Sequence, residues 1–245
     1  MNTFENLNTL EITPIGKLHS PFKEKFGIPR QPGLIKSASA SIEFFAPFND
    51  PNAFKGLENF SHIWLTFCFH QNDNQKWRPL IRPPRLGGNE KVGVFASRSS
   101  FRPNSLGMSV VELLAVELNS GICSLEIACP DILDGTPIFD IKPYIDYSDS
   151  LKNAQCSFAQ HIPEAKLKIE FSDHCETVLK KLSKNYKGCL KALIEETLSY
   201  DPRPAYHQTR QDSLGREYGI RLYDLNVRWR FFKGGVVEVN SIERV

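Results

Sequence analysis

Residues 93–109, GVFASRSSFRPNSLGMS, combine residue types that bind anions. Arg98 and Arg102 bracket two serines and Phe101, and the stretch contains no acidic residue. A guanidinium presents paired N–H donors that match the two oxygens of a carboxylate or phosphate. Pro103 restricts the backbone directly after the second arginine. The pattern therefore predicts a binding site for a carboxylate or a phosphate.

Three other segments combine backbone-shaping residues with polar side chains. They are IPRQPGL at 28–34, FHQ at 69–71 and DILDGTPIFDIKPY at 131–144. Each has an ordinary explanation as well, because Pro-Gly and Asp-Gly pairs form turns and a histidine at a strand end is usually a satisfied surface or core residue. Their occurrence together in one β-rich region predicts that they meet at one end of a rigid sheet, where binding sites are commonly built.

The charge of the chain is concentrated in two basic stretches. The net charge is only +2, yet residues 76–103 hold seven basic residues against Glu90 alone, and residues 203–230 hold six arginines against three acids. Local basic stretches on a nearly neutral chain indicate defined anion sites, not a diffuse grip on a polyanion. A solvated surface face is an equally good explanation for either stretch.

The first 147 residues read mainly as β-strands. Short runs rich in branched and aromatic residues, separated by turn residues, predict strands at 39–47, 62–70, 92–97, 109–118, 122–128 and 137–145. No strand–helix alternation is present, which argues against a doubly wound sheet. A barrel-like or strongly curved antiparallel or mixed sheet fits better.

The remainder reads as a smaller α+β region. A polar, irregular segment at 146–165 predicts a linker, and helical spacing predicts helices at 175–186 and 188–200. Residues 218–232 read as a strand that turns at 233–235 into a second strand. We therefore expect two domains, residues 1–147 and 148–245.

Several classes of protein are disfavoured by what the sequence lacks. It has neither a GxGxxG nor a GxxxxGK[ST] motif, and neither HExxH nor GxSxG. No run of 18 apolar residues and no secretory signal pattern is present, so neither a membrane span nor export is expected. The six cysteines form no CxxC pair, which predicts reduced, mostly buried thiols in a cytoplasmic protein and no metal site.

The motifs together resemble the signature of the TrmO (TsaA-like) family of tRNA methyltransferases. The resemblance rests on GVFASRSSFRPNSLGMS, PRQPGL at 29–34, FSHIWLTFCFHQ at 60–71, RPPRLGG at 82–88, DGTPIFDIKPY at 134–144, DPRPAY at 201–206 and DLNVRWR at 224–230. It runs in the family's order from about residue 12 to the C-terminus. The sequence departs from the family's common pattern at Ser97 and Ser105, where Thr and Pro are frequent.

The resemblance implies a fold, a cofactor and a reaction. The expected fold is mainly β, with a single-sheeted β-barrel that binds S-adenosylmethionine (SAM), followed by a small α+β C-terminal domain. The implied reaction is methylation of N6 of threonylcarbamoyladenosine at position 37 of tRNA, beside the anticodon and chiefly in threonine tRNA. Members of the family are homodimers with the SAM site near the dimer interface.

On this resemblance we expect one SAM site built from the four segments. Pro29, Arg30, Gln31, His70 and Gln71 are expected to form one wall. Arg98 or Arg30 would bind the methionine carboxylate of SAM, with the threonyl carboxylate of the substrate as an alternative ligand of Arg98. Asp134 would face the sulfonium cation, and the adenine ring would lie against Leu106, Gly135, Thr136 and Pro137. The sequence identifies no catalytic base.

The basic stretches provide candidates for contact with the anticodon arm of tRNA. These are Arg82, Arg85, Arg102, Arg203, Tyr206, Arg228 and Arg230. Arginines beside aromatic residues suit phosphate contact combined with base stacking. For Arg102, the alternative to tRNA contact is an ion pair that ties its loop to a carboxylate. For Arg228 and Arg230, the alternative is a strand that simply buries its aromatic residues and exposes its arginines.

Two alternative functions remain open at this point. One is a SAM- or RNA-binding module without catalytic activity, although the presence of all four segments speaks against it. The other is methylation of a different anionic small molecule, which leaves the second basic stretch without a use.

Overall fold

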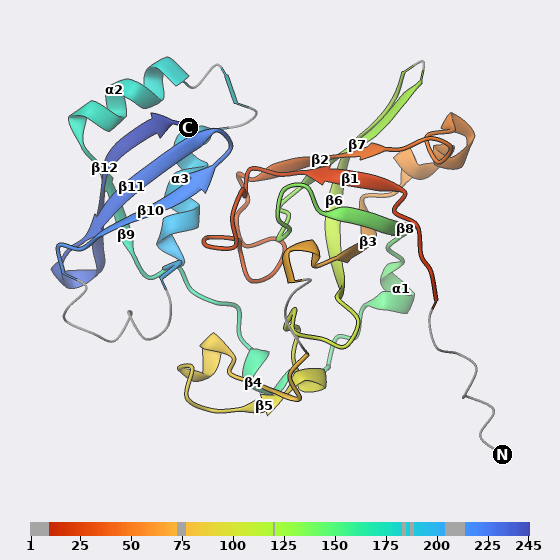
Figure 1. The fold of residues 1–245 in the computed structure, drawn as a ribbon, viewed down its shortest axis with the longest axis horizontal. Helices are drawn as coiled ribbons and strands as arrows, with labels where there is room; N and C mark the ends of the chain where they lie inside the picture. The colour runs from red at the N-terminus through yellow and green to blue at the C-terminus, as the bar shows by residue number, and fades with distance from the viewer. Residues whose placement is uncertain (1–9, 73–76, 120, 183–184, 187–188, 204–213) are drawn as a thin grey trace.

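The computed structural model describes residues 10–72, 77–119, 121–182, 185–186, 189–203 and 214–245. Two β-structures lie side by side, and a small two-stranded sheet lies below them in the view of Figure 1. Tyr206, one of the predicted tRNA contacts, falls outside the described residues.

Within the described residues, six strands close into an antiparallel barrel in the order β1-β2-β7-β6-β3-β8. Their bounds are β1 Gly16–His19, β2 Ser39–Phe44, β3 His62–Cys68, β6 Leu106–Asn119, β7 Ile122–Ala128 and β8 Pro137–Pro143. The prediction of a mainly β fold with a β-barrel is therefore confirmed. Strand β1 was not predicted, because four residues give too short a pattern to recognise.

The alternation of side chains along each strand explains why this sheet closes. In β3 the inward residues Ile63, Leu65 and Phe67 are buried, and the intervening residues face outward. Gly107 of β6 lies directly opposite Phe67. A Cβ atom at Gly107 would come within 2.3 Å of the Phe67 ring, so the core depends on this glycine.

Loops and short turns connect the barrel strands. The predicted strand 92–97 is only the two-residue β5 Val92–Gly93, which pairs with β4 Leu80–Ile81 and is followed by a 3-10 turn. The 3-10 helices are η1 Pro51–Phe54, η2 Leu57–Asn59, η3 His70–Asn72, η4 Pro84–Leu86, η5 Val94–Ala96, η6 Ser157–Ala159 and η8 Lys233–Gly235. The segment at 146–165 contains the short helix α1 Asp146–Asp149 and η6.

In the described residues, the C-terminal region is a four-stranded sheet with two helices. The sheet has the order β10-β11-β12-β9, with β9 parallel to β12. The bounds are β9 Lys168–Phe171, α2 Asp173–Leu182, α3 Leu190–Ser199, β10 Glu217–Leu222, β11 Leu225–Phe231 and β12 Val236–Arg244. Both predicted helices are present with slightly different ends, and β9 was not predicted.

The predicted strand at 218–232 is in fact two strands. Tyr223 adopts a φ of 54°, and the chain reverses there between β10 and β11. A tight turn without glycine or proline leaves no clear mark in the sequence, so the two strands read as one.

The two regions share part of their packing. Phe22, Ile35 and Ala38, which precede β2, belong to the same buried cluster as α2, α3 and the C-terminal sheet. The barrel has a separate cluster of its own. Residues 20–38 therefore join the two cores, although they lie in the first of the two predicted domains.

Candidate functional site

The four segments singled out in the sequence contact one another at one end of the barrel. Arg98 donates a hydrogen bond to the Oε1 of Gln31 at 2.5 Å, and the Asn72 side chain donates to the carbonyl of Ser100 at 3.2 Å. The segment 131–136 reaches the same place, since Thr136 lies 3.3 Å from His70. The structure thus brings together residues up to about a hundred positions apart in the sequence.

A cavity of about 230 Å³ lies where these segments meet. Phe67 and Phe69 at the end of β3, with Leu133, provide apolar surface. Of the residues predicted to bind SAM, His70, Gln71 and Thr136 line the cavity. A mostly apolar pocket with a few polar groups is the usual form of a small-molecule site.

Lys25 places a positive charge in this cavity. Its Nζ donates to the carbonyl of Gln71 at 2.9 Å and to the Oδ1 of Asn72 at 2.7 Å. Asn72 is itself buried, at 6% exposed, so the ammonium is held against a fixed partner. An ammonium has three N–H donors, and this geometry leaves room for a carboxylate of a ligand. Lys25 lies outside the four segments that the sequence singles out.

The histidine of the cavity is held in a defined orientation. Thr136 donates its hydroxyl hydrogen to the carbonyl of Leu133 at 2.7 Å, and the same Oγ1 lies 3.3 Å from the Nδ1 of His70. Because the single hydroxyl hydrogen of Thr136 is donated to Leu133, Thr136 is the acceptor in its contact with His70, and this contact favours a proton on Nδ1. The 133–136 turn therefore helps to orient the His70 ring.

Asp131 places a negative charge in the same cavity. The hydroxyl of Ser109, on β6, donates to its Oδ1 at 2.7 Å. Burial raises the pKa of Asp131 to about 6, and the hydrogen bond from Ser109 and the charge of Arg98 oppose that rise. Among the described residues no lysine or arginine forms an ion pair with it. Asp131 opens the DILDGTP motif, whose predicted SAM ligand is Asp134.

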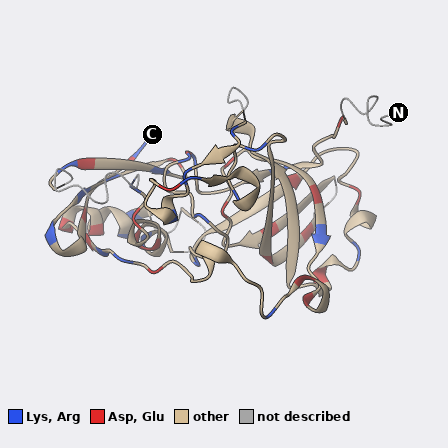
Figure 2. Cartoon of the chain, turned by 90° about the horizontal axis from the view of Figure 1, so that it is seen from below, with Lys and Arg blue, Asp and Glu red and all other residues tan. Residues whose placement is uncertain are grey.

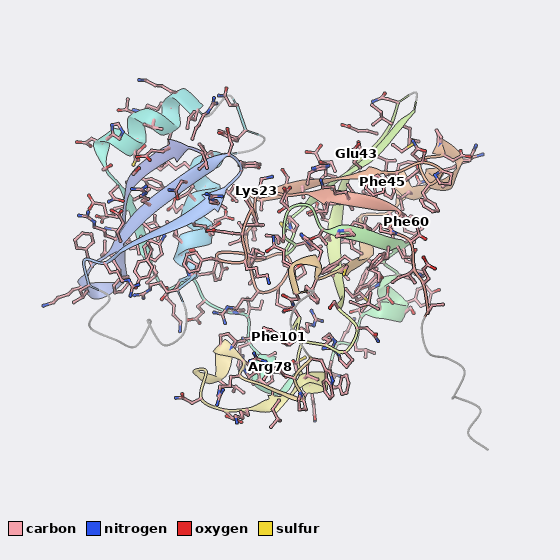
Figure 3. The ribbon with its side chains drawn as sticks, viewed as in Figure 1. Lys23, Glu43, Phe45, Phe60, Arg78 and Phe101 are labelled. Atoms are coloured by element: carbon pink, nitrogen blue, oxygen red, sulfur yellow. The ribbon has the colours of Figure 1, made fainter. Side chains whose placement is uncertain are left out.

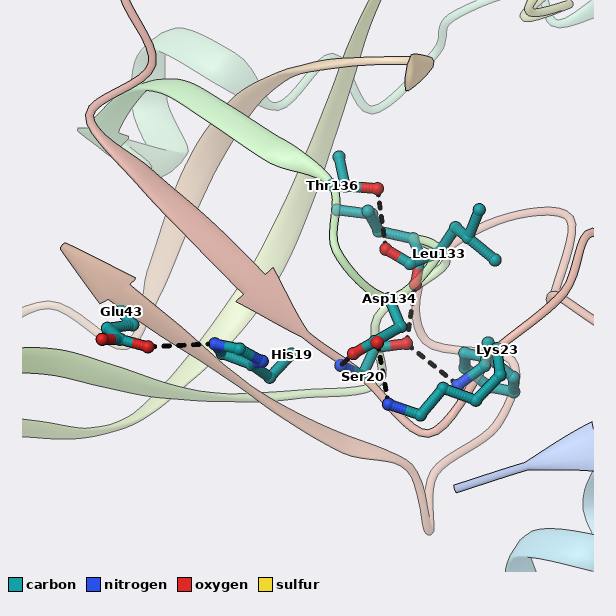
Figure 4. A network of polar contacts seen from close by, with 9 residues as sticks. His19, Ser20, Lys23, Glu43, Leu133, Asp134 and Thr136 are labelled. Atoms are coloured by element: carbon teal, nitrogen blue, oxygen red, sulfur yellow. Dashed lines mark hydrogen bonds and ion pairs between the residues drawn. The ribbon is translucent and has the colours of Figure 1, made fainter. Parts of the chain in front are cut away.

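Asp134, by contrast, is held by contacts with residues that follow β1. Its carboxylate accepts from the backbone N–H of Ser20 at 2.9 Å and pairs with Lys23 at 2.8 Å, as Figure 4 shows. The neighbouring Gly135, with a φ of 78°, donates its N–H to the carbonyl of Leu18. Asp134 thus fixes the 133–136 turn to the end of β1. Its role as a SAM ligand stays a prediction.

The other predicted SAM ligands surround the cavity without lining it. Pro29, Arg30 and Gln31 form the loop that Arg98 contacts. Leu106 begins β6 and is 40% exposed, and Pro137 begins β8. Their predicted contacts with SAM remain predictions.

In the first basic stretch, the arginines differ in what they contact. Arg102 donates to the carbonyls of Ser97 and Val94, at 2.8 and 3.3 Å, and lies 5.7 Å from the Phe95 ring. It therefore ties its own loop together, through carbonyls and not through a carboxylate. Arg82 is exposed, and the exposed Arg85 donates to the carbonyl of His161. Figure 3 labels Arg78 beside Phe101 in this part of the chain.

In the second basic stretch, the prediction for Arg203 is wrong. Its side chain is 2% exposed and makes two hydrogen bonds of 2.7 Å to Asp201, with the guanidinium 3.9 Å from the Phe231 ring. A buried, paired arginine cannot reach a tRNA phosphate. Arg228 and Arg230 are exposed but share Glu217, at 3.8 and 3.3 Å.

The charge distribution outside these stretches suggests no further site. Figure 2 shows basic and acidic residues interspersed along the chain. Among the described residues, no group of three or more His, Cys, Asp and Glu is arranged to hold a metal ion. No helix in the described ranges is both long and apolar enough to cross a bilayer.

The cavity fits a ligand that carries charges of both signs. Its apolar walls suit a flat ring, Lys25 and the nearby Arg98 suit a carboxylate, and Asp131 is the carboxylate that faces the interior. SAM has an adenine ring, a carboxylate and two cationic groups, so the residues present are compatible with it.

Comparison with family models and known proteins gives matches over nearly the whole chain. The tRNA-methyltransferase O N-terminal domain matches residues 17–150, and the TrmO C-terminal domain matches residues 164–245. The tRNA (adenine(37)-N6)-methyltransferase of Escherichia coli (strain K12) is 46% identical over 97% of this chain and 99% of its own length.

Two proteins of Pseudomonas aeruginosa are also similar. A putative S-adenosylmethionine-dependent methyltransferase, RcsF, is 41% identical over 96% of this chain and 98% of its own length. A crystal structure of TrmO superposes with a TM-score of 0.81 at 35% identity, over 98% of this chain and all of that one. The similarity therefore extends to both regions of the fold.

Proposed function

The chain belongs to the TrmO family, and on that premise we propose that it methylates N6 of threonylcarbamoyladenosine at position 37 of tRNA, chiefly threonine tRNA. It is a SAM-dependent tRNA methyltransferase. The observation that carries the finer proposal is a pair of cations, Lys25 in the cavity lining and Arg98 in the neighbouring loop, where it contacts Gln31. The proposed reaction involves two carboxylates, one on SAM and one on the threonyl group of the substrate.

The chain's own residues account for binding and orientation. SAM, when bound, supplies an electrophilic methyl group. Phe67 and Phe69 exclude water from the apolar part of the cavity, and Lys25 and Arg98 hold carboxylates. Transfer to a nitrogen gains mainly from positioning, which can contribute about 7–11 kcal/mol. His70, fixed by Thr136, forms part of the wall that orients the reactants.

We extend the proposal to the partners. Exposed Arg82 and Arg85 would contact phosphates of the anticodon arm, with Arg228 and Arg230 as further candidates. A homodimer is supported by the exposed large apolar side chains that β6 presents, namely Leu106, Met108, Leu114 and Leu118. A tRNA substrate is consistent with a cytoplasmic location.

The test is nucleoside mass spectrometry on threonine tRNA that carries threonylcarbamoyladenosine, incubated with the protein with and without SAM. The expected result is one added methyl mass on that nucleoside, only with SAM. Unmodified transcripts, which lack the threonylcarbamoyl group, are the matched control and should gain no methyl.

Two other outcomes would contradict the proposal at different points. Methylation of the transcript without the threonylcarbamoyl group would show that the substrate is a plain adenosine. SAM binding by calorimetry without any methylated nucleoside would show that the acceptor is another molecule.

A further inference from the structure

Asp131 is the one carboxylate among the described residues that line the cavity, and no role in the reaction itself has been given to it so far. It follows β7 in the chain, faces the cavity and receives a hydrogen bond from Ser109 across the barrel wall. Burial of a carboxylate is unfavourable unless the charge is compensated. A partly buried, weakly compensated carboxylate in a ligand cavity is a candidate for proton transfer.

The groups around Asp131 come from every segment packed against it. Ser109 of β6 donates to it, Arg98 acts on its charge, and Lys25 and His70 line the same cavity. Lys25 is cationic, and the Nδ1 of His70 contacts Thr136. Asp131 is therefore the anionic member of the group, and it has the protonation state that a base requires at neutral pH.

The proposed substrate needs such a group. Its N6 carries one hydrogen and lies between the purine ring and the carbonyl of the carbamoyl group, so the nitrogen lone pair is delocalised. Removal of the proton makes that pair available for bond formation. Asp131 lies in the lining of the cavity that is formed between the four segments.

We propose that Asp131 is the general base that accepts the N6 proton of the substrate during methyl transfer. The inference rests on the proposed function, because it concerns the same acceptor nitrogen. The N6–H bond breaks and its proton passes to the Asp131 carboxylate. The N6 electron pair forms the bond to the methyl carbon as the carbon–sulfur bond breaks, and that bonding pair stays on sulfur.

Ser109 is a positioning residue in this scheme. Its hydroxyl donates to Oδ1 at 2.7 Å, which orients the carboxylate and favours the ionised form. Without this donor, Asp131 should hold its proton to a higher pH. Ser109 is 3% exposed, so its effect is transmitted through Asp131 and not through direct contact with bulk solvent.

The first experiment compares single-turnover methylation by the wild type, Asp131→Asn and Asp140→Asn. Methylation by the wild type tests the proposed function by itself. Loss of a general base is expected to slow Asp131→Asn by about 10²–10⁴-fold, with SAM affinity by calorimetry within about threefold of the wild type. Asp140, an exposed carboxylate beside Lys142, is the matched control and should keep the wild-type rate.

Two results would overturn the inference while leaving the proposed function intact. If Asp131→Asn keeps the wild-type rate, another acceptor, such as the substrate's own carboxylate, takes the proton. If the variant loses SAM affinity and recovers its rate at saturating SAM, Asp131 is a ligand of SAM and not a base.

The second experiment needs no turnover. Carbon-13 NMR of the ligand-free protein should show one carboxyl resonance, absent in Asp131→Asn, that titrates near pH 6. Ser109→Ala should move that titration to higher pH and move the acid limb of kcat/KM in the same direction. Two results would overturn the assignment. One is an Asp131 resonance that titrates in the pH range of exposed aspartates, and the other is an acid side of the kcat/KM–pH profile that Ser109→Ala does not shift.

Discussion

Each of the two regions encloses a charged side chain, Asp131 at the barrel cavity and Arg203 in the C-terminal region. Arg203 makes two hydrogen bonds of 2.7 Å to Asp201 and lies against the Phe231 ring. Asp131 receives only neutral hydrogen bonds, from the Ser109 hydroxyl and from the backbone at Asp131 itself, and faces a cavity. The C-terminal charge is thus compensated within the fold, whereas the barrel charge is compensated only in part.

This difference separates a structural charge from a functional one. A buried ion pair does not by itself make a protein more stable, but removal of one partner leaves an uncompensated charge. A carboxylate without a cationic partner raises the free energy of the folded state. Proteins keep such a carboxylate mainly at sites that bind a ligand or transfer a proton. The following predictions test the contrast, beginning with the largest expected effect.

Arg203→Ala should destabilise the protein by about 3–5 kcal/mol, because it leaves Asp201 in a buried site without its cation. The free energy of unfolding from urea denaturation measures this effect. Arg230→Ala is the matched control, because its pair with Glu217 is exposed and should contribute less than about 1 kcal/mol. Equal destabilisation of the two variants would show that burial of the charge is not what matters.

Asp131→Asn should stabilise the protein at pH 8 by about 3 kcal/mol. The pKa of Asp131 is about 6 in the folded state against 3.8 in the unfolded chain. Since the folded pKa is raised, the contribution of Asp131 to stability is fully present below pH 3.8 and is lost as the pH rises through 6. Asparagine does not ionise, so its burial carries no charge penalty, and at pH 8 the variant should unfold at a higher temperature than the wild type.

The same comparison at pH 5 provides the control for this prediction. At pH 5 most of the folded wild type is protonated at Asp131 while the unfolded chain is still ionised, so the advantage of Asp131→Asn should fall to about half of its value at pH 8. Thermal unfolding of both proteins at pH 5 and pH 8 measures the difference. An advantage that is the same at both pH values would contradict the raised pKa.

The two basic stretches repeat the contrast on the surface. Arg82 and Arg85 are exposed in a segment poor in acids, whereas Arg228 and Arg230 share the carboxylate of Glu217. Replacing Arg82 and Arg85 with alanine should reduce the salt dependence of tRNA binding, by about one unit of log–log slope for each arginine that binds a phosphate. Replacing Arg228 and Arg230 should reduce it less, as measured by salt titration of tRNA affinity.

Glu217→Gln should have the smallest effect, and in the opposite direction. Hydrogen bonds from Asn240 and the nearby Arg230 lower the pKa of Glu217, so it is anionic at neutral pH and competes with phosphate for these arginines. Its removal should increase tRNA affinity by about two- to threefold and steepen the salt slope. Unchanged binding would place Arg228 and Arg230 outside the tRNA interface.

The sequence predicted the strands well where the pattern is long. The expected strand at 122–128 matches β7, and 62–70 differs from β3 only at its C-terminal end. It failed at β1 and β9, which have four residues each, and at Tyr223, where the turn carries no glycine or proline. Periodicity over a few residues is too weak a signal to identify a strand.

The choice between Asp131 and Asp134 shows the same limit at the site. Both lie in one motif, three residues apart, and the sequence gives no reason to prefer the one that faces the cavity. Asp134 meets the backbone N–H of Ser20, 114 positions away, and Asp131 meets Ser109, on a different strand. Only the closure of the barrel decides which carboxylate is engaged by β1 and which is left to a ligand.

By itself, the sequence determined the mainly β fold, the four segments of the site and its family, because these depend on local pattern and on motif order along the chain. The tertiary structure alone decided that Arg203 is buried, that Arg102 holds its own loop, and that Asp131 and Lys25 share one cavity. The physical reason is that the burial and pairing of a charge depend on residues far apart in the chain, which local sequence patterns do not encode.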